Sequence, residues 1–266
     1  MTDKVLYNCD GAVATITLNR PESMNAMDAD LLNAVAELGH EAANDPEVRC
    51  VVITGNGRAF CAGGDVKGMA AGNESGERQS NLVGRVDVLR QQEEISRLLH
   101  EMPKPTLAAV NGVAAGAGLS VALAADIRIA SDQARFTTAF ARVGFSGDFG
   151  GTWFLQRLVG PAKARELYFL SPMLSAQDAL DLGIVNRVVP HESFIDEAMA
   201  LARQLASGPT LAFGRMKENF NFGAAHTLGE SLGKEAENMV ASGATEDHKN
   251  AAAAFVEKRE PTFVGR

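Results

Sequence analysis

The chain has 266 residues, of which 46% are hydrophobic and 22% charged, as is usual for a soluble globular protein with a sizeable core. A net charge of −8 without any basic run argues against a nucleic-acid-binding protein, although a few local cations can still hold a phosphate. There is no signal-peptide pattern, no apolar run of about 20 residues and no metal-like cysteine spacing. We therefore expect a cytoplasmic protein with no metal, no membrane segment and free cysteines, of which Cys9 and Cys50 lie in the core.

Hydrophobic periodicity divides most of the chain into short strands and helices. In order, it predicts strands at 5–9 and 13–18 around an Asp10-Gly11 turn, a helix capped by Asp28 or Asp30, a strand at 50–54, a helix at 83–102, a strand at 106–110, a helix at 121–125, a strand at 127–130, helices at 162–170 and 175–182, and a strand at 187–189. Beyond residue 192 the pattern is helical throughout, with breaks at Gly208-Pro209, Gly223 and Gly243. This shift predicts a mixed α/β part, 1–195, and a helical part, 196–266.

Two glycine-rich loops, 58–67 and 111–120, each follow an apolar strand. Their small residues leave backbone N–H groups uncovered, and a glycine-rich turn between a strand and a helix directs such groups at an anion. Amides from both loops could share one ligand oxygen and stabilise a developing oxyanion. Taken singly, either loop could be a tight turn that binds nothing.

Two other enzyme classes fit these loops poorly. Ser120 is in no Gly-x-Ser-x-Gly setting, and none of the five histidines lies in a motif that would supply its base, which disfavours a serine hydrolase. The run 112–118 lacks the Gly-x-Gly-x-x-Gly spacing of a dinucleotide-binding loop.

Six stretches, which include parts of both loops, together form a recognisable family pattern: Leu18-Asn-Arg-Pro21, Arg58-Ala-Phe-Cys-Ala-Gly-Gly-Asp65, Ala109-Val-Asn-Gly112, Asp126-Ile-Arg-Ile-Ala130, Ser175-Ala-Gln-Asp-Ala-Leu180 and Phe255-Val-Glu-Lys-Arg259. In these stretches the chain resembles the crotonase, or enoyl-CoA hydratase/isomerase, family. The resemblance implies an α/β fold, a ββα spiral that binds acyl-CoA over 1–195, with a helical C-terminal oligomerisation region over 196–266. It also implies a homotrimer or dimer of trimers, an acyl-CoA thioester substrate and no cofactor, since CoA is part of the substrate.

The resemblance further assigns site residues. The Gly64 and Ala117 amides would form the oxyanion hole, and Ala62 would lie against the adenine. Gly64, Asp65, Val66 and Lys67 would line the CoA and acyl channel. Phe255 and Lys258 match positions that reach the CoA of a neighbouring subunit, although Lys258 could instead be a solvated helix lysine.

The reaction type depends on the acids of the site. Hydratases of the family use two glutamates, and the matching positions here are Ser120 and Phe140, which cannot transfer protons in that way. One acid, Asp148, lies in the segment 144–153, which resembles the matching loop of 1,2-epoxyphenylacetyl-CoA isomerases and some enoyl-CoA isomerases. Its carboxylate could shuttle a proton, or could simply bond its own backbone in a turn.

The resemblance and these acids predict an acyl-CoA isomerase with one aspartate acid/base. Two alternatives stay open: an enoyl-CoA hydratase that uses Glu93, Glu94 or Glu101, and a non-catalytic acyl-CoA-binding protein. Neither the acyl group nor the choice between trimer and hexamer follows from the sequence.

Overall fold

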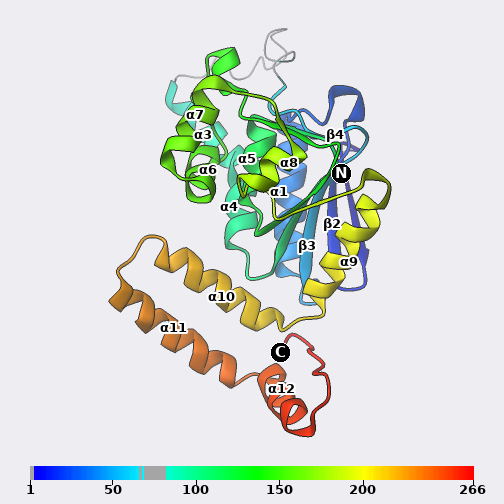
Figure 1. The fold of residues 1–266 in the computed structure, drawn as a ribbon, viewed down its shortest axis with the longest axis vertical. Helices are drawn as coiled ribbons and strands as arrows, with labels where there is room; N and C mark the ends of the chain where they lie inside the picture. Colours follow the sequence, from blue (N-terminus) through cyan, green and yellow to red (C-terminus); the bar gives the residue numbers. More distant parts are fainter. Residues whose placement is uncertain (1–2, 66–67, 69–81) are drawn as a thin grey trace.

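The chain forms two β-sheets by repeating one unit, in which a strand of the first sheet leads into a short strand of the second. The structure, a computed structural model, describes residues 3–65, 68 and 82–266 (Figure 1). Within these residues the first sheet has six strands, in the order β1 (Val5–Asp10), β2 (Val13–Leu18), β3 (Cys50–Gly55), β5 (Thr106–Val110), β7 (Ile127–Ser131) and β10 (Arg187–Val189). The second has four, in the order β4 (Ala59–Cys61), β6 (Val113–Ala115), β8 (Arg135–Thr137) and β9 (Leu174–Ser175).

Strand pairing shows how the unit repeats. The pairs β3–β4, β5–β6 and β7–β8 each give one strand to each sheet, and the corresponding strands of successive pairs are parallel. The expected hairpin of β1 and β2 is antiparallel and turns at Gly11, whose φ is +58°. Helices connect the successive units, so the ββα spiral that the resemblance implies is the observed architecture.

Helices cover both faces of the first sheet. On one face lie α1 (Ala29–Asn44), α4 (Glu94–Glu101) and α5 (Ala117–Ala124), and on the other lies α9 (Phe194–Ala206). In β3, Val51 and Ile53 pack in the first core and Cys50 and Val52 in the second, which explains why its sequence is continuously apolar. Of the two predicted caps of α1, Asp28 and Asp30, the structure selects Asp28, whose carboxylate accepts the Leu31 N–H at 2.9 Å.

The remaining helices of the spiral are α3 (Leu82–Gln92), α6 (Gly151–Val159), α7 (Pro161–Leu170) and α8 (Ala176–Asp181).

Three features differ from the sequence prediction. The segment 83–102 forms two helices, α3 and α4, which break at Glu93. The helix α6 begins at Gly151, inside the segment 144–153 expected to be a loop. Cys9 is exposed instead of buried, because β1 is the edge strand of its sheet and leaves one side uncovered.

The C-terminal helices separate into two groups. The helix α9 packs against the first sheet, and its buried residues include Phe194, Leu201 and Ala206. Beyond Pro209, α10 (Thr210–Gly223), α11 (Leu228–Gly243) and α12 (Glu246–Glu257) extend away from the sheets (Figure 1). The helix breaks at Gly208-Pro209, Gly223 and Gly243 are therefore confirmed. The division of the chain into parts 1–195 and 196–266 stays a prediction. Most of α9 belongs by sequence to the second part, but it packs against the sheet of the first part.

The end of the chain is tied back by hydrogen bonds. Arg49, which precedes β3, donates to the Phe263 carbonyl oxygen at 2.9 Å and to Thr210 Oγ1 at 2.8 Å. The buried Asp247 carboxylate accepts the Val264 N–H at 2.6 Å. None of the helices formed by the described residues has the length and apolar character needed to cross a membrane.

Candidate active site

A cavity of about 590 Å³ lies where the two glycine-rich loops meet α3 and the loop before α6. It is lined by Met27, Asp28, Ala29, Leu32, Gly64, Leu82, Arg85, Val86, Leu89, Gln92, Ala117 and residues 145–149. Most of its wall is therefore apolar, and α3 supplies much of it. Three residues proposed from the sequence, Gly64, Ala117 and Asp148, lie together on this cavity.

The first loop is held in place by the segment that precedes α1. Met27 N–H donates to the Gly63 carbonyl oxygen at 2.8 Å, and Asp65 N–H donates to the Met27 carbonyl oxygen at 3.1 Å. Gly64 lies between these two bonds, so its own N–H points away from Met27, and no acceptor among the described residues takes it. The Gly64 N–H is thus available to a ligand in the cavity.

The second loop ends in the first turn of α5. Ala117 is the first residue of that helix, so its N–H has no acceptor within the helix, and no other described residue accepts it. Gly118 follows, and a Cβ there would lie 2.3 Å from the Cys61 carbonyl oxygen, so glycine is required for the two loops to touch. Two free N–H groups on one cavity, one of them at a helix N-terminus, are suited to stabilise a negatively charged oxygen.

Asp148 lies in a tightly turned loop that lines the same cavity as the two amides. Gly147, Phe149 and Gly150 have positive φ, at +108°, +51° and +74°. The Asp148 Oδ1 atom is buried, and within the described residues no donor reaches it. Burial, and then the nearby Glu93 carboxylate, raises the pKa of Asp148 to about 6. This is not the environment of a turn aspartate whose carboxylate bonds its own backbone.

Glu93 supports the Asp148 loop from the break between α3 and α4. Its Oε1 accepts the Phe149 N–H at 2.9 Å. The other two glutamates considered for catalysis face outwards: Glu94 accepts Arg97 Nε at 2.9 Å and Glu101 accepts Arg97 Nη1 at 2.6 Å. The sequence offered Glu93 only as one of three candidate acids, because a contact across 56 residues leaves no local pattern.

The two positions at which hydratases carry glutamates do not line the cavity. Ser120 and Phe140 are buried, with 1% and 6% of their surfaces exposed. Ser120 Oγ donates to the Gly116 carbonyl oxygen at 3.3 Å and is also hydrogen-bonded to Tyr168. Burial raises the pKa of the Tyr168 hydroxyl to about 12, so this pair is neutral at physiological pH.

Of the other proposed binding residues, those that the structure describes do not line this cavity. Ala62 N–H donates to the Met24 carbonyl oxygen at 3.0 Å, and Asp65 forms an ion pair with Arg20 at 3.1 Å; neither side chain lines the cavity. Val66 and Lys67 lie outside the described residues. Phe255 on α12 is exposed, and Lys258 ends that helix with a φ of +56°. Neither of these last two lines the cavity, and their contact with a neighbouring subunit's CoA stays a prediction.

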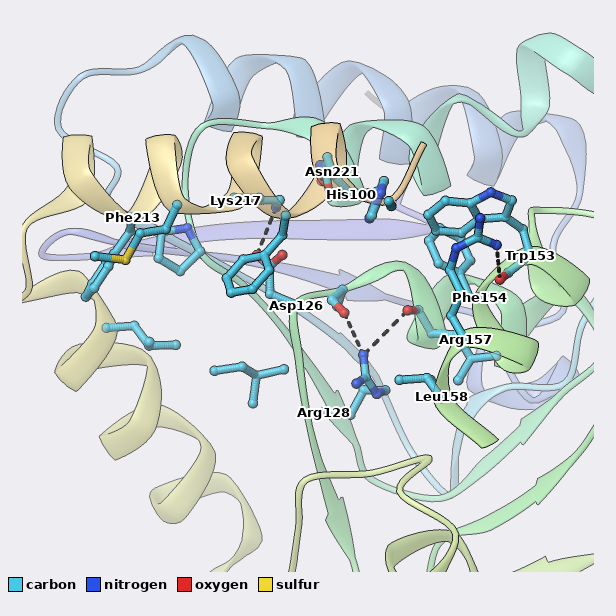
Figure 2. A pocket seen from close by; sticks show the side chains of 18 residues that line it. His100, Asp126, Arg128, Trp153, Phe154, Arg157, Leu158, Phe213, Lys217 and Asn221 are labelled. Carbon is cyan, nitrogen blue, oxygen red and sulfur yellow. Dashed lines mark hydrogen bonds and ion pairs between the residues drawn. The ribbon is translucent and has the colours of Figure 1, made fainter. Parts of the chain in front are cut away.

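A second cavity, of about 640 Å³, lies between α10 and the spiral (Figure 2). Its charged groups already have protein partners: Lys217 binds Asp126 at 2.8 Å, and Arg128 donates to the Ala125 carbonyl oxygen at 2.6 Å. Arg157 lies 3.6 Å above the centre of the Trp153 ring system. None of the predicted site residues lines this cavity, and no cluster of three metal-ligand side chains occurs within the described parts of the chain.

Comparison with known proteins agrees with this geometry. The sequence model described as enoyl-CoA hydratase/isomerase matches residues 8–266. The chain is 38% identical to 1,2-epoxyphenylacetyl-CoA isomerase from Escherichia coli (strain K12), over 100% of both chains. It is 36% identical to short-chain-enoyl-CoA hydratase from Clostridium acetobutylicum, over 97% of this chain and 96% of the other.

A solved structure extends the similarity to three dimensions. The crystal structure of an enoyl-CoA hydratase from Polaromonas sp. JS666 superposes with a TM-score of 0.90 at 34% identity, over 97% of this chain and 99% of the other. The match covers the spiral and the helical C-terminal region alike. The chain belongs to the enoyl-CoA hydratase/isomerase family and is an acyl-CoA enzyme of that family.

Proposed function

We propose that this protein is an acyl-CoA isomerase that holds a thioester enolate and moves its proton with one carboxylate, Asp148. The observation that carries the proposal is the contrast between the two carboxylates on the cavity, Asp28 and Asp148. Burial alone would raise the pKa of Asp28, but hydrogen bonds from Lys4 and Leu31 and the nearby Arg20 outweigh it and lower that pKa. Asp28 is therefore a fixed anion that caps α1, whereas Asp148, with a pKa of about 6, can give and take a proton near neutral pH.

The proposed reaction follows from these positions. The thioester carbonyl oxygen accepts the Gly64 and Ala117 N–H groups, which makes the protons on the neighbouring carbons more acidic. Ionised Asp148 removes a proton from the α or γ carbon, and the electron pair moves onto the thioester oxygen to give the enolate. Protonated Asp148 then returns the proton to the other carbon, which shifts the double bond. For a ring-epoxide substrate the same enolate would drive the rearrangement, as the name of the E. coli relative suggests.

The alternative of hydration has less support at this site. Adding water to a double bond requires groups that activate the water and protonate the α carbon. Ser120 and Phe140 carry no carboxylate, are buried and do not line the cavity. The apolar α3 side chains Leu82, Val86 and Leu89 line the cavity and would help to exclude water from a bound enolate.

An exchange experiment separates the possibilities. The protein is incubated in deuterated water with crotonyl-CoA and, separately, with a 3-enoyl-CoA, and the products are analysed by mass spectrometry and NMR. Deuterium incorporation or a double-bond shift that disappears in Asp148→Asn, while CoA binding persists, supports the isomerase. Net addition of water would make the protein a hydratase, and binding without exchange would make it a non-catalytic acyl-CoA-binding protein.

We also infer that the working form is a homotrimer or a dimer of trimers. The helices α10–α12 expose large apolar side chains: Met216, Phe220, Leu228, Leu232, Met239, Val240, Phe255 and Val256. Such a surface is costly in water and is typical of an interface between subunits. Light scattering after size-exclusion chromatography measures the mass; a monomer of 28.1 kDa at working concentration would contradict the inference.

A further inference from the structure

We propose that Glu93 is a positioning residue. Its carboxylate holds the Asp148 loop in place and adds a second negative charge close to Asp148. The inference rests on the proposed function, because Asp148 must be the group that moves the proton. Glu93 is not among the residues that line the cavity, so it would act through Asp148 and not on the substrate.

The first support is the place of Glu93 in the fold. It is the single residue between α3, whose side chains line the cavity, and α4, whose Ile95 and Leu99 are buried in the core. Glu93 N–H donates to the Leu89 carbonyl oxygen at 2.9 Å, so the hydrogen-bonding pattern of α3 extends to Glu93. A residue at this junction is fixed by the core on one side and adjoins the cavity wall on the other.

The second support is the bond that Glu93 makes. Its Oε1 accepts the N–H of Phe149, the residue directly after Asp148, at 2.9 Å. Phe149 has a φ of +51°, a conformation that non-glycine residues adopt only when their surroundings hold them. Its side chain is 3% exposed, so the buried ring and the charge-assisted hydrogen bond to Glu93 together fix the backbone beside Asp148.

The third support is electrostatic. Among the described residues, the charged or titratable groups that line the cavity with Asp148 or interact with it come from four places: Glu93 between α3 and α4, Arg85 on α3, Asp28 at the start of α1 and Tyr168 on α7. Of these, Glu93 adds to burial in disfavouring the ionised form of Asp148. Asp28 is neutralised by Lys4 and Arg20, and Tyr168 stays protonated. Glu93 would thus keep Asp148 able to take up a proton in the neutral range.

Two variants of Glu93 separate its charge from its hydrogen bond. Glu93→Gln keeps an oxygen that can accept the Phe149 N–H but removes the charge. We expect the acidic limb of the pH profile for α-proton exchange to move to lower pH by about half a unit or more, with little change in the rate at pH 8. Glu93→Ala also removes the hydrogen bond, so we expect the same shift of the acidic limb together with an about tenfold lower rate at pH 8, because the loop is no longer held. Glu101→Gln, which removes an exposed charge from α4, is the matched control and should leave the profile unchanged.

A direct readout uses the carboxyl carbon of Asp148, observed by NMR in protein labelled with ¹³C-aspartate and assigned by its absence in Asp148→Asn. Its titration midpoint should fall in Glu93→Gln and stay in place in Glu101→Gln. An unchanged midpoint in Glu93→Gln would overturn the inference, even if Asp148 proves essential. Full exchange in Asp148→Asn would instead refute the proposed function, whatever Glu93 does. Circular dichroism checks folding, and Glu93→Gln alone decides the matter if Glu93→Ala does not fold.

Discussion

Gly63 and Ala115 approach so closely that a Cβ on Gly63 would lie 2.9 Å from the Ala115 carbonyl oxygen. The same Cβ would lie 3.5 Å from the Ala117 nitrogen, and the φ of Gly63 is +96°. The residue before the first amide of the proposed oxyanion hole is thus in contact with the loop that supplies the second. The spacing of the two amides depends on a glycine at position 63.

Gly63→Ala should therefore impair the oxyanion hole, and with it proton exchange, more than it impairs folding stability. The added methyl group must push the loops apart and also strains the backbone, at a cost of about 1–3 kcal/mol in folding stability. We expect proton exchange to fall by about 10²- to 10³-fold, as when one oxyanion donor is lost. Gly229→Ala on α11 is the control, because a Cβ there meets nothing within 4 Å. Equal exchange rates in the two variants would show that the spacing of the loops does not matter.

The raised pKa of Asp148 predicts how its removal changes stability with pH. An aspartate with a folded-state pKa of about 6 and an ordinary value of 3.8 binds its proton more tightly in the folded protein. Its contribution to stability is present below about pH 4 and is lost as the pH rises through about 6. Asp148→Asn should therefore be more stable than the parent at pH 8 by about 1–2 kcal/mol, after allowance for partial exposure.

Urea unfolding of both proteins at pH 4 and pH 8 measures this difference. The advantage of Asp148→Asn should be near zero at the lower pH. A variant that is less stable than the parent at pH 8 would mean that the Asp148 carboxylate is stabilised by a partner, and that its pKa is not raised.

The same pKa predicts the pH dependence of catalysis. Asp148 must be ionised to remove the first proton, so kcat/KM for α-proton exchange should rise with pH and reach half its maximum near pH 6. The rate with an acyl-CoA substrate, measured between pH 4.5 and pH 8.5 at constant ionic strength, tests this. A profile that is flat from pH 5 to pH 7 would exclude Asp148 as the base.

The buried ion pair of Lys217 and Asp126 predicts a change in stability without a change in chemistry. Lys217 Nζ lies 2.8 Å from Asp126 Oδ2 and 2.7 Å from the Leu99 carbonyl oxygen, and its side chain is 9% exposed (Figure 2). Lys217→Met leaves the partly buried Asp126 carboxylate without this cation and should destabilise the protein by about 2–4 kcal/mol. Adding Asp126→Asn should recover part of that loss.

Urea unfolding of the two single variants and the double variant gives the coupling energy. Exchange activity per folded molecule should stay within about twofold of the parent in all three, because neither residue lines the catalytic cavity. Strictly additive losses of stability would show that the pair contributes little beyond its separate hydrogen bonds.

Much of the fold was predictable because its signals are local. The Asp10-Gly11 turn, the Asp28 cap and the glycine breaks at 208, 223 and 243 each depend on a few neighbouring residues. Periodicity did not locate the strands of the second sheet, since they have two or three residues and such lengths carry no period. The helix α6 was missed because it starts with Gly151 after Gly150, and its packing against α5 and α7 outweighs that poor propensity.

In the candidate active site, too, some features could be predicted from the sequence and others could not. Gly64, Ala117 and Asp148 were proposed from motif resemblance, and the fold brings them to one cavity. The bond from Phe149 to Glu93 was not foreseeable, because helical periodicity runs on through Leu89 and Ile95 and hides the break between them.

The bond between Met27 and Gly63 has a consequence for how the protein responds to heat. Met27 precedes α1, Gly64 follows β4 and Ala117 begins α5, so the two amides are aligned by three successive turns of the spiral. A small relative movement of those turns would change the separation of the amides while every helix and strand stayed intact. Warming should therefore lower the exchange rate reversibly, relative to its expected rise, at temperatures where the far-ultraviolet circular dichroism is still that of the native protein. Catalysis would thus report the alignment of the turns before secondary structure melts.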